Sequence, residues 1–451
     1  MKFGAVVMAA GLGTRMASTE PKVLHKICGK PLLLHIVELL LSMEAQKIAV
    51  IVNHGKEKVI EALNVALSAQ QKKRVLWIDQ KKPLGTGHAV LQAKSAFQRF
   101  SYPMVILSGD VPAIEAKHIY DLLEIHQQQN PQITFATAHL PIETPYGRVI
   151  RHGGDVVEIK EAKECTPDEL KIREMNLGLY VSSAENVFSL LPQVKNDNSK
   201  KEFYVTDLIK LATTKQALCL EQAESLLGIN TKMDLAHEER VMRNKLNEKW
   251  MQAGVTLEHP ETTYIDPDVK LGQDVVLEPN VHLKGKTVIA SHTVIRTGTI
   301  VEDSIIGEHC TIGPYARIRP GCRIEKEVRI GNFVELKNTR MGEASKAAHL
   351  TYLGDADIGK RVNIGCGVIT CNYDGGLRYA HKAKTKIGDD VFVGSDCQLI
   401  APLVIEKGAY IASGSTVTHK APKDSLVIAR ARQVTKKNYM PMLKKRLKRT
   451  S

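Results

Sequence analysis

The sequence has few cysteines, few aromatic residues and no long hydrophobic run. Eight cysteines are scattered through 451 residues with no CxxC pair, which argues against a disulfide framework or a cysteine zinc site and predicts reduced thiols. No apolar stretch approaches the roughly 18 residues of a membrane-spanning helix, and the N-terminal apolar stretch is too short for a secretory signal. We therefore expect a cytoplasmic protein with no membrane partner.

Positive charge exceeds negative charge, but aromatic side chains that could stack on nucleic-acid bases are scarce. Lys and Arg number 62 against 49 Asp and Glu, a formal net charge of +13, and aromatic residues make up 5% of the chain. Seven of the cations lie in the tail 436–451, where the ordinary interpretation is a solvated segment and the alternative is a contact with a neighbouring subunit or with a phosphorylated small molecule. The charge balance favours phosphorylated small molecules over nucleic acid as partners.

The first half of the chain alternates strand-like and helix-like segments. Gly4–Ala9, Lys47–Val52 and Met104–Leu107 are nearly continuous apolar runs, as in strands that are covered on both faces. Amphipathic segments such as Pro31–Leu40 separate them. This order predicts an α/β domain with a mostly parallel sheet.

The second half has a period of six residues, which fits neither a helix nor a simple strand. One helix is expected first, within 229–254, because apolar side chains recur there at i, i+4 spacing. The period then predicts a β-helix of hexapeptide repeats. Its aliphatic positions are Val269, Val275, Val281, Val294, Ile300, Ile306, Ile312, Ile318, Ile324, Ile330, Leu336, Ile358, Ile364, Ile387, Val393, Leu399, Ile405, Ile411 and Val417.

Two segments break this period, at 337–357 and 370–386. We expect both to leave the coil as binding loops, although a neutral insertion is the alternative.

A glycine-rich turn follows the first predicted strand. Its backbone N–H groups can cradle phosphate, and Arg15 and Lys22 add positive charge. The turn is not a Walker A loop, because no Gly-Lys-Ser/Thr closes it. Asp110 ends another apolar strand, where it suits Mg²⁺ that bridges substrate phosphates, with a helix N-cap as the alternative.

The motif AAGLGTRM followed by PK resembles the signature of sugar-nucleotide pyrophosphorylases. Together with the hexapeptide period and the segments HLTYLGDADIG and CNYDGG, the whole chain resembles the bacterial family of bifunctional N-acetylglucosamine-1-phosphate uridyltransferases and glucosamine-1-phosphate acetyltransferases. The resemblance implies a Rossmann-like nucleotidyltransferase domain at 1–228, a linker helix at 229–254, a left-handed parallel β-helix at 255–435 and a basic tail at 436–451.

The resemblance also implies a uridyltransferase site. Ser108 departs from it, because the family often has tyrosine there. Arg15 and Lys22 are the expected catalytic cations, and Asp110 and Asn230 the expected Mg²⁺ ligands. The expected contacts of UTP and the sugar are Ala10, Gly11, Leu12, Gly13, Arg15, Lys22, Gln80, Gly85, Thr86, Asp110, Gly147, Glu161, Asn176, Thr206 and Asn230.

A second, acetyltransferase site is implied in the β-helix, with His349 as the base because an imidazole titrates near neutral pH. Cys366 and Ser413 stand where the family more often has alanine. The expected contacts of glucosamine 1-phosphate are Arg319, Lys337, Tyr352, Asn363 and Lys382, with Arg378 as an alternative to Lys382. Those of acetyl-CoA are Cys366, Asn372, Tyr373, Ser395, Ser413 and Arg430.

The implied function is acetylation of glucosamine 1-phosphate followed by Mg²⁺-dependent uridylyl transfer from UTP, which yields UDP-N-acetylglucosamine, a cell-wall precursor. The implied assembly is a homotrimer. Two alternatives remain open at the level of the sequence. One is a monofunctional sugar-1-phosphate nucleotidyltransferase with a structural β-helix, and the other is a non-catalytic assembly module.

Overall fold

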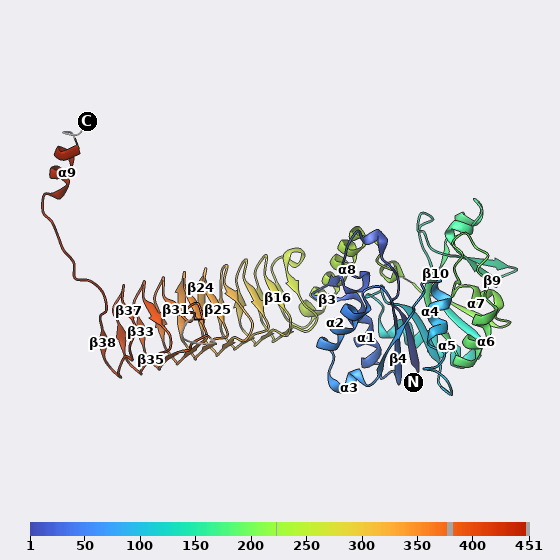
Figure 1. Ribbon diagram of the computed structural model, residues 1–451, viewed down its shortest axis with the longest axis horizontal. Coiled ribbons are helices and arrows are strands. Elements are labelled where there is room, and N and C mark those ends of the chain that lie inside the picture. Colours follow the sequence, from blue (N-terminus) through green and yellow to red (C-terminus); the bar gives the residue numbers. More distant parts are fainter. Residues whose placement is uncertain (222, 377–381, 448–451) are drawn as a thin grey trace. The chain divides into compact units, whose positions relative to one another are not determined.

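The computed structural model describes residues 1–221, 223–376 and 382–447. The chain divides into two compact units, Met1–Arg243 and Asn244–Ser451. Helix α8 (Lys232–Gln252) runs across this division (Figure 1). None of the eight cysteines, all of which lie in the described ranges, forms a disulfide. Within the described ranges, no helix is both long enough and apolar enough to cross a membrane.

The first unit is built on one mixed sheet. Strand β1 pairs in parallel with β4 and β6, while β10 pairs antiparallel with β6 and β7. The described strands follow the order β11-β7-β10-β6-β1-β4-β5, with β8 paired to β10 and β9 paired to β8. Their bounds are β1 (Gly4–Met8), β4 (Lys47–Val52), β5 (Val75–Asp79), β6 (Met104–Ser108), β7 (Ile133–His139), β8 (Arg148–His152), β9 (Asp155–Lys160), β10 (Glu174–Ser182) and β11 (Lys215–Cys219), with a separate hairpin of β2 (Lys26–Ile27) and β3 (Lys30–Pro31).

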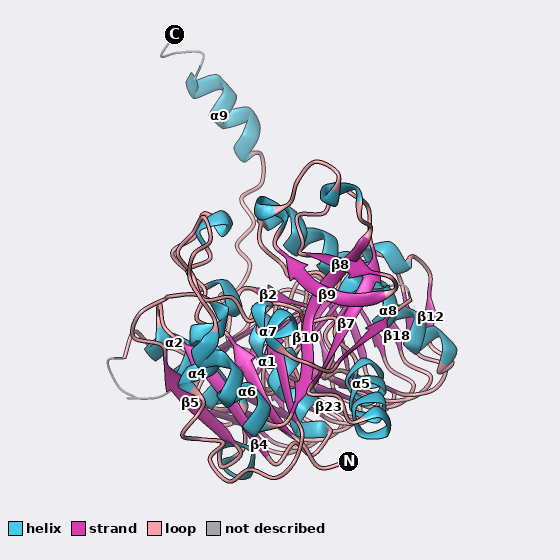
Figure 2. Cartoon of the chain, turned by 90° about the vertical axis from the view of Figure 1, so that its right-hand side faces the viewer, coloured by secondary structure: helices cyan, strands magenta, loops and turns pink. Residues whose placement is uncertain are grey.

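Helices cover both faces of this sheet (Figure 2). Val6 belongs to one apolar core, whereas its neighbours Ala5 and Val7 belong to the other, so the alternate side chains of β1 are buried on opposite faces. This is why the strands are apolar without interruption. Helices α1 (Leu32–Ser42), α2 (Lys56–Ala66) and α5 (Ala116–Gln129) pack on one face, and α4 (Thr86–Gln92), α6 (Ala184–Leu190) and α7 (Asp207–Leu211) on the other. The remaining short helices of the unit are α3 (Ala69–Lys72), η1 (Thr14–Met16), η2 (Lys22–Leu24), η3 (Ala162–Glu164), η4 (Glu169–Lys171), η5 (Leu191–Gln193) and η6 (Ala223–Leu226).

The carboxyl ends of β1 and β6 lie side by side. Met8 is in register with Ser108, and the Gly109 N–H donates to the Met8 carbonyl over 2.8 Å. A Cβ on Gly109 would lie 3.1 Å from that carbonyl oxygen, so the two chains approach closely there. The glycine-rich turn and Asp110 therefore start from the same edge of the sheet.

The second unit is a parallel β-helix whose short strands stack coil upon coil (Figure 1). The described strands form three sheets. The first contains β12 (Thr256–Leu257), β15 (Val276–Leu277), β18 (Val294–Ile295), β21 (Thr311–Ile312), β24 (Arg329–Asn332), β27 (Lys346–His349), β30 (Asn363–Ile364), β33 (Phe392–Val393), β36 (Tyr410–Ile411) and β38 (Leu426–Val427). The second contains β13 (Tyr264–Ile265), β16 (His282–Lys284), β19 (Ile300–Glu302), β22 (Arg317–Ile318), β25 (Glu335–Lys337), β28 (Tyr352–Gly354), β31 (Ile369–Cys371), β34 (Gln398–Ile400) and β37 (Thr416–Val417). The third contains β14 (Lys270–Leu271), β17 (Val288–Ile289), β20 (Ile305–Ile306), β23 (Arg323–Ile324), β26 (Arg340–Met341), β29 (Ala356–Ile358), β32 (Thr385–Ile387) and β35 (Leu403–Ile405). Helices η7 (Pro260–Thr262) and α9 (Tyr439–Leu447) complete the unit.

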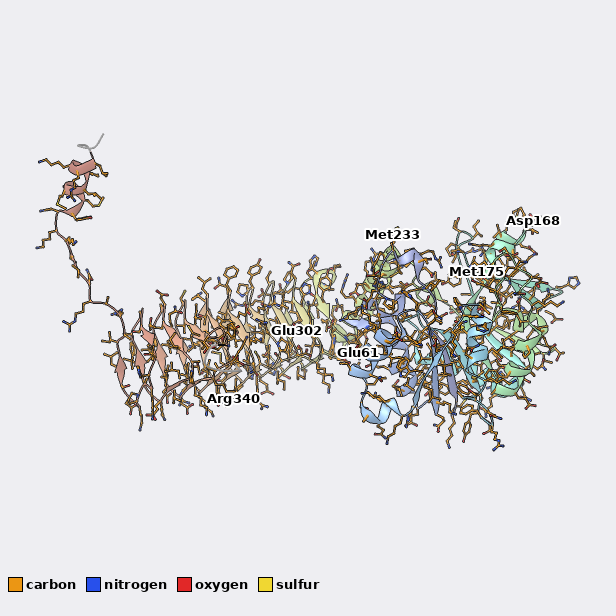
Figure 3. All side chains as sticks on the ribbon, in the orientation of Figure 1. Glu61, Asp168, Met175, Met233, Glu302 and Arg340 are labelled. Carbon is orange, nitrogen blue, oxygen red and sulfur yellow. The ribbon has the colours of Figure 1, made fainter. Side chains whose placement is uncertain are left out.

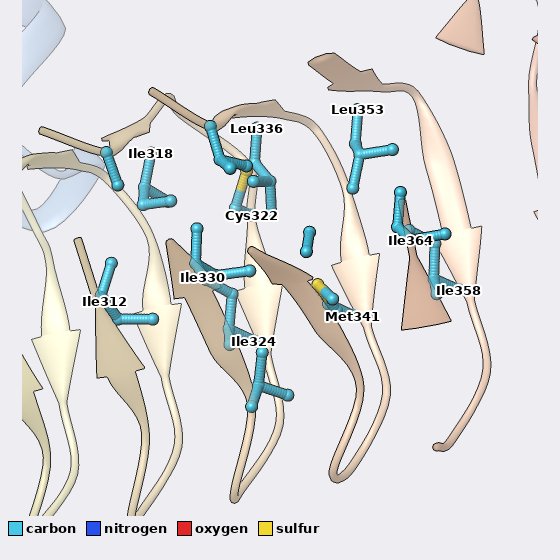
Figure 4. Packing of buried hydrophobic residues seen from close by; sticks show 14 of the residues in the cluster. Ile312, Ile318, Cys322, Ile324, Ile330, Leu336, Met341, Leu353, Ile358 and Ile364 are labelled. Atoms are coloured by element: carbon cyan, nitrogen blue, oxygen red, sulfur yellow. The ribbon is translucent and has the colours of Figure 1, made fainter. Parts of the chain in front are cut away.

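A column of aliphatic side chains fills the β-helix, as the period of six predicts (Figure 4). The predicted register is wrong over part of the first coils. Val294 and Ile300 are only partly buried, and their neighbours Ile295 and Val301 occupy the core instead. Because each of these strands carries two adjacent aliphatic residues, the period alone does not decide which one points inward. From Ile306 onward the predicted positions are buried.

The two predicted interruptions differ from each other. Segment 337–357 does not leave the coil. Its strands β26, β27 and β28 each pair in parallel with a strand of the preceding coil, namely β23, β24 and β25. Met341, Ala347 and Leu353 take the core positions. The sequence pattern looked interrupted there because methionine and alanine, instead of isoleucine, valine or leucine, occupy two of these core positions. In the second interruption, 370–386, both ends belong to strands β31 and β32, and the described chain leaves the coil at Asn372; residues 377–381 lie outside the described residues. The predicted fold class, an α/β nucleotidyltransferase domain followed by a hexapeptide β-helix, is confirmed.

Candidate active sites

The glycine-rich turn connects β1 to η1. Gly13 has φ +63°, and a Cβ there would lie 2.7 Å from Cβ of Lys22. Glycine is therefore required both by the backbone conformation and by the close approach of Lys22. A Cβ on Gly11 would meet nothing within 4 Å, and the Leu12 side chain is exposed. The turn, which begins at Ala10, thus leaves open space above its backbone.

Four predicted site residues, from distant parts of the sequence, meet beside this turn. The Lys22 ammonium forms an ion pair with Oδ2 of Asp110 and donates a hydrogen bond to Oδ1 of Asn230 over 2.8 Å. The Arg15 guanidinium donates to the same Asn230 oxygen over 2.8 Å. The side chains of Lys22 and Asp110 are only 12% and 18% exposed, so little water screens their attraction.

The start of α8 fixes the position of Asn230. Its own N–H and that of Thr231 donate to Oδ2 of Asp234, over 2.9 and 2.8 Å, which is a helix-capping arrangement. The Asn230 amide nitrogen donates to the Gly228 carbonyl over 2.9 Å. Its amide oxygen is therefore the atom that faces the cations. A Cβ on Gly228 would lie 3.2 Å from both carboxylate oxygens of Asp110.

Oδ2 of Asp110 and Oδ1 of Asn230 are oxygens that suit a divalent metal ion. One cation, the Lys22 ammonium, contacts both the Asp110 carboxylate and the Asn230 amide oxygen. Mg²⁺ prefers such hard oxygen ligands, and it commonly takes one or two from the protein and the rest from phosphates and water. Among the residues that the structure describes, no group of three or more His, Cys, Asp or Glu side chains is arranged to hold a metal ion. The donor set therefore fits a metal that is bound together with a phosphorylated substrate.

A second loop of the first unit contains Gln80, Gly85 and Thr86. Gln80 is buried and its amide nitrogen donates to the Gly85 carbonyl over 3.1 Å. Gly85 has φ +110°, and a Cβ there would lie 2.5 Å from the Phe203 carbonyl oxygen. The Val205 N–H donates to the Thr86 hydroxyl oxygen over 3.0 Å. This loop is thereby fixed against the chain that precedes α7.

Gly147, Asn176, Glu161 and Thr206 form another group in the same unit. The Asn176 N–H donates to the Gly147 carbonyl over 2.9 Å. The Thr206 hydroxyl donates to Oε1 of Glu161 over 3.3 Å, and a Cβ on Gly147 would lie 3.8 Å from the same oxygen. Burial raises the pKa of the Glu161 carboxyl, and the hydrogen bond from Thr206 opposes the rise. The group offers hydroxyl, amide and carboxyl functions to a polar ligand.

Sequence reasoning missed Tyr146. Its hydroxyl accepts a hydrogen bond from the Gly228 N–H over 2.5 Å, beside Asp110. Burial raises the pKa of Tyr146, and the negative charge of Asp110 adds to the rise. The available signal was its position directly before Gly147, which the resemblance had selected.

In the β-helix, His349 pairs with another residue that sequence reasoning missed. Nδ1 of His349 lies 3.0 Å from Oδ1 of Asn332. The two residues are in register on neighbouring strands β27 and β24, so the coil spacing itself brings them together. An amide oxygen at Nδ1 favours the tautomer with a proton there, which leaves a lone pair on Nε2. The imidazole is exposed and can reach a ligand.

The predicted phosphate-binding cations lie near one another. The pKa of Lys337 is lowered chiefly because the Lys382 ammonium lies beside it, and the positive charge of Arg319 adds to this effect. Arg319 also donates to Oε1 of Glu335 over 2.8 Å. Arg378 lies outside the described residues. Tyr352 is in register with Glu335, while Asn363 lies on β30, in the sheet that carries His349.

Asp355 ties Asn372 to the coil; it lies in the segment HLTYLGDADIG, but no role was predicted for it from the sequence. Its carboxylate accepts hydrogen bonds from the side-chain amides of Asn372 and Asn338, each over 2.6 Å. The Ala383 N–H donates to the Asn372 carbonyl over 3.0 Å, which closes the base of the loop. Tyr373, the next residue, is 69% exposed.

Cys366, Ser395 and Ser413 follow one another at the same turn of successive coils. The Asp396 N–H donates to the Cys366 carbonyl over 2.7 Å, and the Gly414 N–H donates to the Ser395 carbonyl over 2.8 Å. The Arg430 guanidinium donates to the Ser413 carbonyl over 2.5 Å. These predicted acetyl-CoA contacts thus form one continuous row along the coil.

Comparison with known proteins matches both units. The family described as MobA-like NTP transferase domain matches residues 5–163, GMPPB C-terminal domain matches 253–341, and bacterial transferase hexapeptide (six repeats) matches 384–419. A protein of Halalkalibacterium halodurans named bifunctional protein GlmU is 41% identical, over 97% of this chain and 98% of that protein. Proteins of the same name from Shouchella clausii and Listeria welshimeri are each 43% identical, with the same coverage. The chain belongs to the GlmU family.

Membership of the GlmU family confirms the expected function, a bifunctional enzyme with uridyltransferase and acetyltransferase activities. The relatives cover the α/β unit and the β-helix alike, and their name calls them bifunctional. This favours two activities over a monofunctional nucleotidyltransferase and over a non-catalytic module.

Proposed function

We propose that the first unit transfers a uridylyl group from UTP to N-acetylglucosamine 1-phosphate and that the β-helix acetylates glucosamine 1-phosphate with acetyl-CoA. The observation that carries the first half is the group of Lys22, Asp110, Asn230 and Arg15 beside an open glycine turn. Such a group neutralises phosphate charge, which is the main requirement of phosphoryl-transfer chemistry.

In the uridylyl transfer, an oxygen of the sugar phosphate attacks the α-phosphorus of UTP. A new P–O bond forms as the bond to pyrophosphate breaks, and no covalent protein intermediate is needed. Lys22 and Arg15 hold the phosphates and stabilise the charge that develops on them. Mg²⁺ bound by Asp110 and Asn230 would add further charge neutralisation.

Around the reacting phosphates, the proposed ligand contacts fall into two groups. The loop N–H groups from Ala10 to Gly13, together with Gln80, Gly85 and Thr86, bind UTP. Gly147, Glu161, Asn176 and Thr206 bind the sugar. The hydrogen bonds between Gly147 and Asn176 and between Thr206 and Glu161 support treating the second group as one subsite.

In the acetyl transfer, the sugar amine attacks the carbonyl carbon of acetyl-CoA, and the thiol of CoA leaves. His349 accepts the proton from the amine at Nε2, and Asn332 keeps the imidazole oriented. Arg319, Lys337 and Lys382 bind the phosphate of glucosamine 1-phosphate, with Tyr352 and Asn363 at the sugar. Cys366, Asn372, Tyr373, Ser395, Ser413 and Arg430 contact acetyl-CoA.

The assembly that we propose is a homotrimer that acts in the cytoplasm. Tyr315, Phe333 and Leu350 are each more than half exposed, at the same turn of successive coils, and the first two rings stack at 5.7 Å. An apolar row of this kind beside His349 is typical of a surface that a second copy covers. We propose the domain bounds 1–228, 229–254, 255–435 and 436–451. Light scattering of the purified protein should give the mass of three chains.

A matched pair of variants tests the proposed sugar subsite. Glu161→Gln should raise KM for N-acetylglucosamine 1-phosphate about tenfold, the cost of one charge-assisted hydrogen bond. Glu158→Gln, on the same segment but paired with Lys210 at 2.9 Å, should change it less than about twofold. Equal effects of both variants would contradict the proposed subsite.

A further inference from the structure

Arg148 is a buried cation whose partners are all backbone carbonyls. Its side chain is 1% exposed, although it carries a guanidinium. Among the described residues it forms no ion pair, and its Nε has no hydrogen-bond partner. Burying a charge without a carboxylate is costly, so a residue of this kind is expected to serve a purpose that a smaller apolar side chain cannot.

The guanidinium joins two loops. Nη1 donates to the carbonyls of Thr144, over 2.8 Å, and Tyr146. Nη2 donates to the carbonyls of Ile142, over 2.7 Å, and Leu170, over 3.4 Å. The first three carbonyls belong to the loop between β7 and β8, and the fourth belongs to η4. Asp168, just before η4, is labelled in Figure 3.

The loop that Arg148 holds contacts Gly228 and carries Gly147, one of the proposed sugar contacts. The Tyr146 hydroxyl accepts the Gly228 N–H beside Asp110. The Gly147 carbonyl accepts the Asn176 N–H over 2.9 Å, and a Cβ on Gly147 would lie only 2.8 Å from Cγ2 of Ile159. A small shift of the loop would therefore displace Gly147 within the proposed sugar subsite.

We propose that Arg148 is a positioning residue for the sugar phosphate, because its planar fork sets the conformation of residues 142–147 and so the place of Gly147 in the sugar subsite. This rests on the proposed placement of N-acetylglucosamine 1-phosphate at Gly147, Glu161 and Asn176. Lysine keeps the charge but lacks the fork, so it cannot bond to four carbonyls at once. UTP binds through the glycine turn and the Gln80 loop, which Arg148 does not contact.

The test compares Arg148→Lys with Arg151→Lys in the full-length protein. Arg151 lies on the same strand, β8, but is 37% exposed and pairs with Glu174 at 2.7 and 2.8 Å. Arg148→Lys should raise KM for N-acetylglucosamine 1-phosphate about tenfold and change KM for UTP less than about twofold. It should also speed amide hydrogen exchange at 142–147 and 169–171, while Arg151→Lys leaves all three measurements near wild type. Circular dichroism of each preparation serves as the folding control, because the acetyltransferase rate reports only on the second unit.

Equal rises of both KM values, or no rise in either, would overturn the proposal. If Arg148→Lys is not recovered folded, Arg148→Gln takes its place under the same criteria, and loss of folding in both variants would assign Arg148 to folding instead. Glu161→Gln separates the proposal from its premise. If Glu161→Gln raises KM for N-acetylglucosamine 1-phosphate but Arg148→Lys does not, only the positioning role of Arg148 is refuted. If Glu161→Gln leaves this KM unchanged, the sugar subsite itself is refuted.

Discussion

Replacing Asp110 by asparagine should silence one activity and spare the other. The substitution keeps the shape of the side chain but removes the negative charge that pairs with the Lys22 ammonium. Lys22 then keeps only the hydrogen bond to Asn230, at 2.8 Å. Because both side chains of the ion pair are less than one-fifth exposed, solvent replaces little of the lost attraction.

The magnitude follows from the cations that Asp110 holds beside the reacting phosphates, namely the Lys22 ammonium and the proposed Mg²⁺. A preorganised charged group at a reacting phosphate contributes about 3–4 kcal/mol, or a factor of about 10² to 10³ in rate. Asp110→Asn should therefore lower kcat/KM for pyrophosphate release by at least that factor. The acetyl transfer should stay within about twofold, because its proposed residues all lie in the second compact unit.

The assay follows both reactions in one preparation. Pyrophosphate release reports uridylyl transfer, and thiol release from acetyl-CoA reports acetyl transfer. Asp79→Asn is the matched control, because Asp79 also ends a strand of the sheet and pairs with a lysine, Lys56, at 2.6 Å, but it is one-third exposed. Loss of this exposed ion pair in Asp79→Asn should lower the free energy of unfolding by less than about 1 kcal/mol. The reasoning fails if folded Asp110→Asn loses both activities, or if its uridylyl transfer stays within tenfold of wild type.

Three further outcomes concern the acetyltransferase site. Asn332→Ala should lower kcat for acetyl transfer about fivefold, because one hydrogen bond to His349 of roughly 1 kcal/mol is lost, and an unchanged kcat would show that the contact does not orient the base. The neighbouring Lys382 lowers the pKa of Lys337, so Lys337 loses its proton at a lower pH than an ordinary lysine. Competitive inhibition of acetyl transfer by N-acetylglucosamine 1-phosphate should accordingly weaken as pH rises through that lowered pKa. In Lys382→Met the weakening should shift to higher pH, and a shift in the opposite direction would refute the cluster. Alkylation of the half-buried Cys366 should slow acetyl transfer and CoA should protect it, whereas full modification at an unchanged rate would remove Cys366 from the CoA path.

The first site was largely predictable from sequence because its residues belong to local motifs. The glycine turn and Lys22 lie within one short segment, and Asp110 directly follows an apolar strand. Parallel strands bring their carboxyl ends to one edge of the sheet, so the pairing of these motifs follows from the fold. Whether they bind the proposed ligands remains a prediction.

Other features depended on contacts that the sequence does not reveal. Arg148 acts through carbonyl oxygens, and any residue type can supply those. Asp355 holds Asn372 on the next coil, 17 residues further along the chain, but the coil spacing does not show which polar side chains on neighbouring coils form a hydrogen bond. The segment 337–357 kept its place in the β-helix because Met341 and Ala347 fill the core as isoleucine does elsewhere. A search for aliphatic residues alone could not find that continuity.

The most direct test of two linked activities is the conversion of glucosamine 1-phosphate by the purified full-length protein. With UTP, Mg²⁺ and acetyl-CoA present, the account predicts one free CoA and one pyrophosphate for each UDP-N-acetylglucosamine formed. Without acetyl-CoA it predicts neither pyrophosphate nor nucleotide sugar at an appreciable rate, and addition of N-acetylglucosamine 1-phosphate should restore both. Pyrophosphate release from glucosamine 1-phosphate at the full rate without acetyl-CoA, or no release of CoA under any condition, would contradict the account.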